Sequence, residues 1–305
     1  MPALPSNDDL RVFIAVARKA SFVAVADALG VSPAYVTKRV RVLEAQLGVR
    51  LLDRSTRRVV VTEDGERVYE WAERVLDDVD QLLQATRAAR GTPRGTLRIS
   101  SSFGFGRRVV APLIVRLVAR YPELQVRFDV FDRLVDVAGE GFDLDVRVGD
   151  EIAPNLRARR LASNERVLCA APDYLASRGV PETPADLAEH DCLVIKERDH
   201  PFGVWRLLRR GQPQTVKVTG PLATNNGEIA VQWALQGQGV VLRSRWDVDA
   251  MLADGRLCRV LPDYAQPANI WAVYPARLEQ SARLRVCVAF LEAAFAGRAG
   301  AAVDA

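Results

Sequence analysis

Apolar side chains recur at helical spacing along the first fifty residues and fall into three short segments. A helix is predicted over residues 8–19, with Asn7 as its cap, because its apolar positions share one face. These positions are Leu10, Phe13, Ile14 and Ala17. A second helix is predicted over residues 22–29, capped by Ser21 and ended by Gly30, because a residue without a Cβ suits a left-handed turn.

A third helix is predicted from Pro33 to Leu47, with Ser32 as its cap and Gly48 behind it. Its apolar positions recur every three or four residues and are expected to face inward: Val36, Val40, Leu43 and Leu47. The opposite face carries small and basic side chains, which can approach base edges and phosphates closely: Ala34, Thr37, Lys38 and Arg41. Two short helices joined by a tight glycine turn, the second exposing such groups, indicate a helix-turn-helix.

Residues 63–90 predict one long helix, capped by Thr62 and ended by Gly91 and Pro93. Apolar residues form a heptad seam along it: Val68, Ala72, Val75, Val79 and Leu82. We interpret the seam as a dimerisation surface, which would pair two recognition helices with two half-sites. The alternative is an amphipathic helix that packs on its own domain.

From residue 92 onward, strand-like and helix-like segments alternate. A strand at 95–102, a helix at about 104–120, a strand at 124–131, a helix-like stretch at 132–141 and a strand at 142–149 predict an α/β lobe with parallel strands. A second lobe begins near Glu165. The chain then returns to the first lobe through a strand near residue 270 and a final amphipathic helix. Two passages between lobes are expected, near 161–165 and 265–269.

Charge separates the chain into a basic head and a nearly neutral remainder. Residues 1–60 hold ten Lys and Arg against five Asp and Glu, a net charge of +5, whereas the whole chain carries +4. A basic small domain indicates a polyanionic partner at one end of the molecule. For Lys38, Arg39 and Arg41 the alternative is a solvated helix face. Against it stands the β-prone run after Gly48, which carries further arginines and is typical of a wing along the phosphate backbone.

The four cysteines, Cys169, Cys192, Cys258 and Cys287, lie too far apart for a C-x-x-C pair, and the chain has two histidines. We therefore expect reduced thiols, no metal site, no cofactor and no His-dependent catalysis. The chain has no run of about 18 uncharged apolar residues and no signal-peptide pattern at its start, so a cytoplasmic protein without membrane partners is expected.

The N-terminal pattern resembles that of LysR-type transcriptional regulators. The resemblance rests on Ser21-Phe22, on the Leu43-Glu44 pair, on Gly48, on the Leu-Leu-x-Arg run at 51–54 and on the Thr-x-x-Gly spacing at 62–65. Valines at 23 and 25 depart from the alanine or threonine usual there. The resemblance and the helix pattern together predict these DNA-binding residues: Ser32, Pro33, Ala34, Thr37, Lys38, Arg41, Arg54 and Arg57.

The same resemblance implies a bilobed effector domain of the periplasmic-binding-protein fold, with a cleft at the carboxyl ends of strands. Two helix starts are expected to face that cleft and to attract an anion, and three basic residues are candidate counter-charges. The predicted effector residues are Ser101, Ser102, Phe103, Arg147, Lys196, Asn225, Asn226, Gly227 and Arg243.

The expected fold class is thus α/β with an all-α winged helix-turn-helix at the N-terminus (1–62), a linker helix (63–91) and a bilobed effector domain (92–305). Within that domain, lobe 1 would comprise about 92–162 and 268–297, and lobe 2 about 163–267. The second half also resembles the branch of the family that activates tartrate dehydratase genes in enteric bacteria. That branch implies a hydroxy dicarboxylate, tartrate or malate, as effector.

The function predicted from the sequence is a DNA-binding regulator, an activator of catabolic genes, and not an enzyme. Its expected partners are double-stranded DNA with dyad symmetry, a small organic acid, further copies of the chain as a dimer or tetramer, and RNA polymerase. Two other classes were weighed: a bilobed enzyme or solute receptor, and a DNA-architectural protein without a ligand. The first would lack the basic head, and the second would not need a cleft. A regulator of this family with an unrelated effector stays an alternative.

Overall fold

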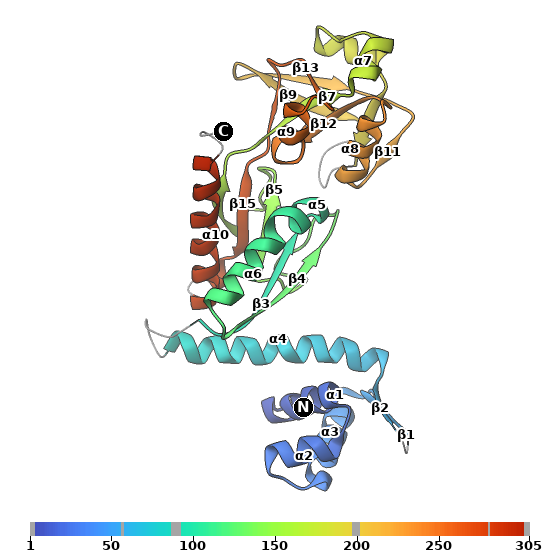
Figure 1. The fold of residues 1–305 in the computed structure, drawn as a ribbon. Coiled ribbons are helices and arrows are strands. Elements are labelled where there is room, and N and C mark those ends of the chain that lie inside the picture. Colours follow the sequence, from blue (N-terminus) through green and yellow to red (C-terminus); the bar gives the residue numbers. More distant parts are fainter. Residues whose placement is uncertain (1–3, 56–57, 87–92, 197–201, 280, 302–305) are drawn as a thin grey trace. The chain divides into compact units, whose positions relative to one another are not determined.

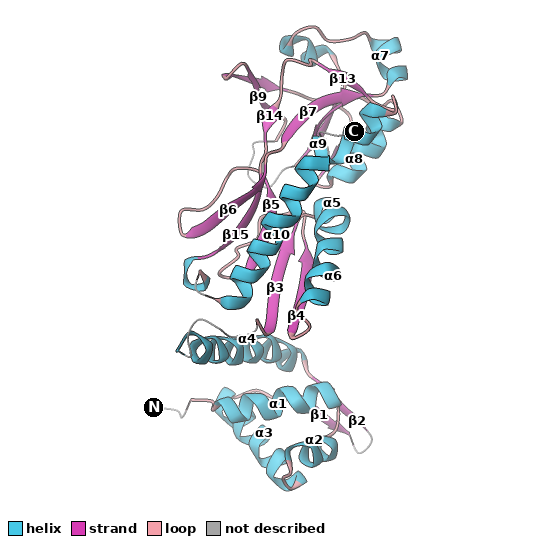
Figure 2. Cartoon of the chain, turned by 60° about the vertical axis from the view of Figure 1, so that its left-hand side comes forward, coloured by secondary structure: helices cyan, strands magenta, loops and turns pink. Residues whose placement is uncertain are grey.

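The computed structural model describes residues 4–55, 58–86, 93–196, 202–279 and 281–301. The chain divides into two compact units, Met1–Gly91 and Thr92–Ala305 (Figure 1). The first unit is mostly helical, and the second is built on two β-sheets with helices on their faces (Figure 2). Among the described residues, no helix is both long enough and apolar enough to cross a membrane.

Three short helices, a hairpin and a long helix make up the first unit. In chain order they are α1 (Asn7–Lys19), α2 (Phe22–Leu29), α3 (Pro33–Leu47), β1 (Leu52–Ser55), β2 (Arg58–Val61) and α4 (Glu63–Thr86). The caps predicted for α2 and α3 are confirmed, because Ser21 and Ser32 each accept a hydrogen bond from an amide in the first turn. The cap predicted for α1 is wrong by one residue: Asn7 is already helical, and Ser6 accepts from the Asp9 amide instead.

The apolar faces of the three helices meet in one core. Phe13 and Leu43 are fully buried there, as the spacing predicts. Leu47 was expected to face inward and is instead 37% exposed, because α3 ends at this residue and Gly48, at φ +71°, turns the chain away. The wing packs on the core through two valines, Val59 and Val61.

Helix α4 packs against α1 along its first turns. The residues that join the core of this unit are Val68, Tyr69, Ala72 and Leu76. The first part of the predicted seam therefore packs within its own unit, as in the alternative interpretation. In the same turns, Trp71 and Val75 lie outside this core and are exposed, at 61% and 42%. The helix is described as far as Thr86, and the predicted stretch from 87 to 90, like the side chain of Leu82, lies outside the described residues.

Two polar side chains fasten the wing to the helices. The Glu44 carboxylate accepts hydrogen bonds from the amides of Leu51 and Leu52, at 2.9 and 3.3 Å. The Thr62 hydroxyl accepts from the Gly65 amide at 2.9 Å and so caps α4 as predicted. A Cβ at Gly65 would lie 2.1 Å from the Leu51 carbonyl oxygen. The Leu-Glu pair and the Thr-x-x-Gly spacing thus fix where the wing begins and where it ends.

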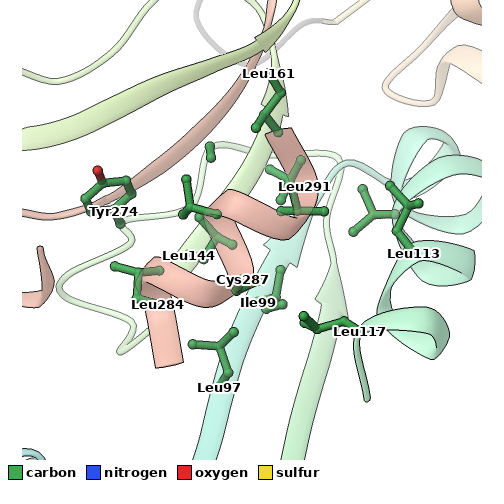
Figure 3. Close-up of a cluster of buried hydrophobic side chains, with 14 of the residues drawn as sticks. Leu97, Ile99, Leu113, Leu117, Leu144, Leu161, Tyr274, Leu284, Cys287 and Leu291 are labelled. Carbon is green, nitrogen blue, oxygen red and sulfur yellow. The ribbon is translucent and has the colours of Figure 1, made fainter. Parts of the chain in front are cut away.

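The first lobe of the second unit is a five-stranded sheet with the order β4-β3-β5-β15-β6. These strands are β3 (Gly95–Ser101), β4 (Leu124–Val130), β5 (Leu144–Val148), β6 (Leu156–Ala162) and β15 (Ile270–Pro275). A short helix α5 (Phe103–Phe105) and a π-helical turn lead into α6 (Ala111–Arg120), which packs beside α10 (Ala282–Ala301) over the sheet. Figure 3 shows the core that they enclose, including Leu97, Ile99, Leu117, Leu284 and Leu291.

The second lobe is a sheet with the order β11-β8-β12-β7-β13, with β14 also pairing with β7. Its strands are β7 (Glu165–Ala170), β8 (Cys192–Ile195), β11 (Ala223–Thr224), β12 (Val240–Ser244), β13 (Cys258–Val260) and β14 (Gln266–Pro267). Helices α8 (Gly227–Leu235) and α9 (Arg245–Ala253) cover one face. The other face is covered by α7 (Pro172–Arg178), a 3-10 helix and the hairpin of β9 (Val204–Arg209) and β10 (Gln212–Lys217).

Two features of the second unit differ from the prediction. Both sheets are mixed and not purely parallel, because β15 runs antiparallel to β5 and β7 runs antiparallel to β12. The stretch 132–141 is not helical: it forms turns in which Val135, Val137 and Phe142 bury their side chains in a small cluster. This loop packs against Leu156 of β6 in lobe 1.

The chain passes between the lobes twice, between β6 and β7 and again between β14 and β15. The two passages lie side by side, because the Ala268 amide donates to the Asn164 carbonyl oxygen at 2.9 Å. Asn164 also donates from its side chain to the Ala268 carbonyl at 2.7 Å. The two crossings therefore form one bonded pair at the positions that the sequence predicts.

The glycine under the wing provides a test of this packing. Gly65→Ala is expected to lower the free energy of unfolding of the first unit by about 2–3 kcal/mol, because the added Cβ meets backbone that must shift. Gly297→Ala is the matched control, since that helical glycine has nothing within 4 Å and should gain up to about 1 kcal/mol. Denaturant unfolding of both variants followed by circular dichroism measures this, and equal effects would contradict the packing argument.

Candidate DNA interface and candidate effector pocket

The outer face of α3 forms an open concave surface in the first unit. Its border is formed by Pro33, Ala34, Thr37, Lys38, Arg41, Val42 and Ala45. Five of the eight residues predicted to bind DNA are among them. Ser32 is exposed one step before this surface, and its hydroxyl accepts the Tyr35 amide at 3.2 Å, so it caps the helix. Arg54 lies in β1 with its side chain outside the described part, and Arg57 lies outside the described residues altogether.

The basic side chains of α3 fall into two groups. Arg39 turns back to its own unit, where its Nε lies 2.6 Å from the buried Asp9 carboxylate and an Nη donates to Ser6 at 2.8 Å. Lys38 and Arg41 instead border the concave surface. The charge pattern therefore contains one residue that secures the fold and two that face outward, and the sequence alone did not separate them.

A pocket of about 230 Å³ opens in the second unit, with lining residues from both lobes. Six of the nine residues predicted for an effector line it: Ser102, Arg147, Lys196, Asn225, Gly227 and Arg243. Further lining residues were not predicted, among them Asp132, Asp150, Glu151, Arg166 and Trp246. The two lobes supply these residues from segments far apart in sequence, so spacing along the chain could not reveal them.

Three of the predicted effector residues are not in the pocket lining. Ser101 is fully buried, and its hydroxyl donates to the Val146 carbonyl of the neighbouring strand at 2.7 Å. Phe103 is 44% exposed outside the pocket. Asn226 caps α8, because its Oδ1 accepts from the amides of Glu228 and Ile229 at 2.9 and 3.2 Å. That cap occupies two amides that were expected to attract an anion, so the side chains lining the pocket become the stronger candidates.

Positive charge outweighs negative charge along the pocket. Four cations line it, Arg147, Arg166, Lys196 and Arg243, against three acids, Asp132, Asp150 and Glu151. The acids are partly occupied by neighbours: the Asp150 Oδ1 accepts from Asn269 and from the Trp271 indole, each at 2.8 Å. Asp132 accepts from the side-chain amide of Asn226 at 2.7 Å. The lining therefore offers guanidinium and ammonium donors of the kind that bind a small anion.

Arg147 is the most rigidly held of these cations. It is 5% exposed, its Nε donates to Asp145 at 2.6 Å, and an Nη donates to the Glu151 carbonyl at 3.4 Å. Asp145 is itself fully buried and accepts from the Ser100 hydroxyl at 2.9 Å. Arg147 and its partner stand two positions apart on β5, so both project from the same face of the strand.

Arg243, in lobe 2, pairs with a carboxylate and occupies the space beside a glycine. Its Nε donates to Asp247 at 2.5 Å. A Cβ at Gly227 would lie 1.9 Å from one of its Nη atoms. The guanidinium group therefore occupies the space that any other residue at 227 would fill. Gly227 thus leaves room for the Arg243 guanidinium group, in addition to lining the pocket.

The four thiols and His190 do not line the pocket. All four cysteines are free, and Cys169, Cys192 and Cys287 are buried. Burial raises the pKa of each of these three thiols to about 12. The buried His190 contacts the Tyr174 hydroxyl at 3.2 Å. Within the described residues, no three His, Cys, Asp or Glu side chains are grouped as metal ligands.

The cysteines give a pH-linked prediction. With a pKa near 12, only roughly one in ten thousand of each buried thiol ionises at pH 8, so Cys169, Cys192 and Cys287 should resist Ellman's reagent in the folded chain. The half-buried Cys258 should be the one thiol per chain that reacts, and all four should react after unfolding. Rapid reaction of two or more thiols in the native protein would contradict the burial.

Two family profiles match the chain. One, described as a bacterial regulatory helix-turn-helix protein of the lysR family, matches residues 7–66. The other, described as the LysR substrate binding domain, matches residues 90–296. The first covers the three helices, the wing and the start of α4, and the second covers both lobes and the pocket.

Named relatives match over nearly the full length. The HTH-type transcriptional regulator DmlR of Escherichia coli (strain K12) is 58% identical over 296 residues, 97% of this chain and 96% of DmlR. The HTH-type transcriptional activator TtdR of the same strain is 48% identical over 289 residues, 95% of this chain and 93% of TtdR. The structure of CrgA, a LysR-type transcriptional regulator from Neisseria meningitidis, has a TM-score of 0.58 at 30% identity, covering 96% of this chain and 99% of CrgA.

Proposed function

The chain belongs to the LysR family of bacterial transcriptional regulators, and from this premise we propose that it is an activator whose α3 face reads DNA and whose pocket binds a hydroxy dicarboxylate. Like its named relatives, it is a transcriptional regulator and not an enzyme. We propose the domain boundaries expected from the sequence: a DNA-binding head over 1–62, a linker helix over 63–91 and an effector domain over 92–305.

The DNA-binding role rests on the shape and charge of α3. Small side chains at Ala34 and Thr37 let the helix approach a base edge, and Lys38 and Arg41 stand beside them on the same concave surface. The proposal retains Ser32 and Pro33 at the helix start, beside the concave surface, and Arg54 and Arg57 in the wing as phosphate contacts. The net charge of the head supports association with a polyanion.

The effector class rests on the size and charge of the pocket. A volume of about 230 Å³ lies below the roughly 300–1,000 Å³ of drug-sized sites, which favours a ligand of a few carbon atoms. Arg147 from lobe 1 and Arg243 from lobe 2 can each receive one carboxylate, and Ser102, Asn225 and Lys196 offer donors between them. A short diacid with hydroxyl groups satisfies such a lining, in agreement with the resemblance to the tartrate branch.

Self-association is proposed through the exposed side of α4. Trp71 and Val75 present apolar surface in the stretch where the heptad seam continues, and a second copy of the helix would cover both. The resulting two-fold symmetry would match a DNA site with dyad symmetry. A dimer is the smallest assembly that this arrangement needs, and a tetramer would pair two such dimers.

DNA binding can be tested with duplexes that the wild-type chain selects from a random pool. Thr37→Ala and Lys38→Ala are each expected to weaken binding about tenfold or more, because each removes a contact worth roughly 1–3 kcal/mol. Lys217→Ala is the control, since it removes the same charge from an exposed site on the second unit. Gel-shift titrations at two salt concentrations measure the DNA affinity of all three variants. Unchanged binding in Thr37→Ala and Lys38→Ala would move the recognition surface elsewhere.

Effector binding can be tested by calorimetric titration of the full chain with D-, L- and meso-tartrate, D- and L-malate, succinate and citrate. One hydroxy diacid is expected to bind with chiral preference, and Arg243→Lys should weaken it at least tenfold, because lysine lacks the planar fork of donors. Gly227→Ala should have a similar effect by displacing that guanidinium.

Arg259→Lys is the matched control for this series, because Arg259 is exposed in the same lobe and does not line the pocket. It should leave the affinity unchanged. Absence of binding across the panel would overturn the hydroxy dicarboxylate assignment and leave the DNA-binding proposal as it stands.

A further inference from the structure

One buried carboxylate lies between two arginines that come from different lobes. Asp247, in the first turn of α9 in lobe 2, has a side chain that is 2% exposed. It accepts from the Nε of Arg243, which lines the pocket. It also pairs with Arg108, which belongs to the π-helical turn before α6 in lobe 1 and does not line the pocket. A single charge therefore joins a pocket residue to the facing lobe.

A second carboxylate binds the same segment of lobe 1. Glu228, in the first turn of α8, pairs with Arg107 and lies 3.5 Å from the Nε of Arg108. Its chain also fills the space beside Gly104, where a Cβ would lie 2.9 Å from the Glu228 Cγ. The cluster contains three arginines and two acids. Asp247 pairs with both Arg108 and Arg243, so these two cations share its charge.

The Trp246 indole contacts both Arg108 and Arg243. The guanidinium carbons of Arg108 and Arg243 lie 5.0 and 5.5 Å from its ring, within the range of a cation–π contact. The same indole lines the pocket and packs edge-on against Phe105 of lobe 1, with ring centroids 5.0 Å apart. We call the cluster of Arg107, Arg108, Glu228 and Asp247 the interlobe seam. Trp246 and Asp247 connect the pocket to this seam.

We propose that Asp247 is a positioning residue that couples the effector pocket to the seam between the two lobes. By holding Arg243 through Nε, it directs the two Nη groups over Gly227 toward the pocket. An anion that binds those Nη groups competes with the charge of Asp247, which then turns more fully to Arg108. Effector binding and lobe contact thereby become linked, and linked equilibria act in both directions.

This inference rests on the proposed function for the identity of the ligand, whereas the coupling of Arg108 to Asp247 can be measured without any ligand. The first experiment is a double-mutant cycle on the full chain with Arg108→Gln, Asp247→Asn and the double variant. The readout is the unfolding equilibrium of the second unit in denaturant. Arg245→Gln and Asp249→Asn form the matched control, because that exposed pair, 3.0 Å apart, lies on the same helix.

Asp247→Asn is expected to lower the folded-to-unfolded ratio tenfold or more, because two cations lose their shared partner. Arg108→Gln should then change that ratio at least fivefold less in the Asp247→Asn background than in the wild-type chain. The control pair should deviate from additivity by less than twofold. Additive behaviour of Arg108 and Asp247 would overturn the inference.

The second experiment measures effector affinity by calorimetry, using the acid of the panel that binds best. Arg108→Gln, which is remote from the pocket lining, is expected to weaken binding at least threefold in the wild-type chain and not at all in Asp247→Asn. Asp247→Asn should itself weaken binding, because Arg243 loses the carboxylate that positions it, and Asp247→Glu, which keeps that charge, should restore binding to within threefold of wild type. An effect of Arg108→Gln that persists in Asp247→Asn, or a glutamate variant no better than the asparagine variant, would overturn the coupling.

The two experiments separate the possible failures. If no acid binds the wild-type chain, the proposed effector class is wrong, and the stability cycle still decides whether Asp247 joins the lobes. If Asp247→Asn does not fold, the cycle is run with Arg108→Gln and Arg243→Gln instead, because these two arginines pair with the same carboxylate. Nonadditive effects of the two arginine variants support the inference, and additive effects overturn it.

Discussion

Burying a guanidinium group costs several kcal/mol unless a carboxylate lies in contact with it, and the second unit meets this constraint on both sides of its pocket. Asp145 holds Arg147 in lobe 1, and Asp247 holds Arg243 in lobe 2. Each acid must itself be held: Ser100 donates to Asp145 across the parallel pair of β3 and β5, where the two residues stand opposite each other. The strand register therefore determines where the pocket can offer positive charge.

The same rule gives order to the basic head. Asp9 is buried at the start of α1 and takes Arg39 from α3, so one arginine secures the helices to each other. Lys38 and Arg41 stay at the concave surface. The positive charge of this unit is thus partly structural and partly available to a partner, and the division follows from which face of α3 each residue occupies.

Local signals predicted the helices well, because caps and apolar spacing act within one turn. Ser21, Ser32 and Thr62 cap the helices that their positions suggest, whereas Leu47 was misjudged because spacing does not reveal where a helix leaves the core. The stretch 132–141 is a loop although the sequence predicts a helix there, because its apolar residues form a local cluster and not one face of a helix. Six pocket residues could be predicted from strand ends and helix starts once the family resemblance implied a cleft. Trp246 and Asp247 could not, because their partners in lobe 1, Phe105 and Arg108, are distant in sequence. In the same cluster, Arg107 and Glu228 are 121 positions apart.

The two arginines of the pocket differ in how they are held, and this asymmetry bears on which ligand could act as a signal. Arg147 is 5% exposed and bonded to Asp145 and to a backbone carbonyl, all within lobe 1, so a carboxylate bound there meets a fixed group. Arg243 shares its acid with Arg108 of the facing lobe. A monoacid that reached only Arg147 would fill part of the pocket and leave the seam unchanged. A diacid long enough to meet both arginines would disturb the shared charge of Asp247, so on the proposed coupling the length of the ligand, and not its charge alone, separates an effector from a competitor.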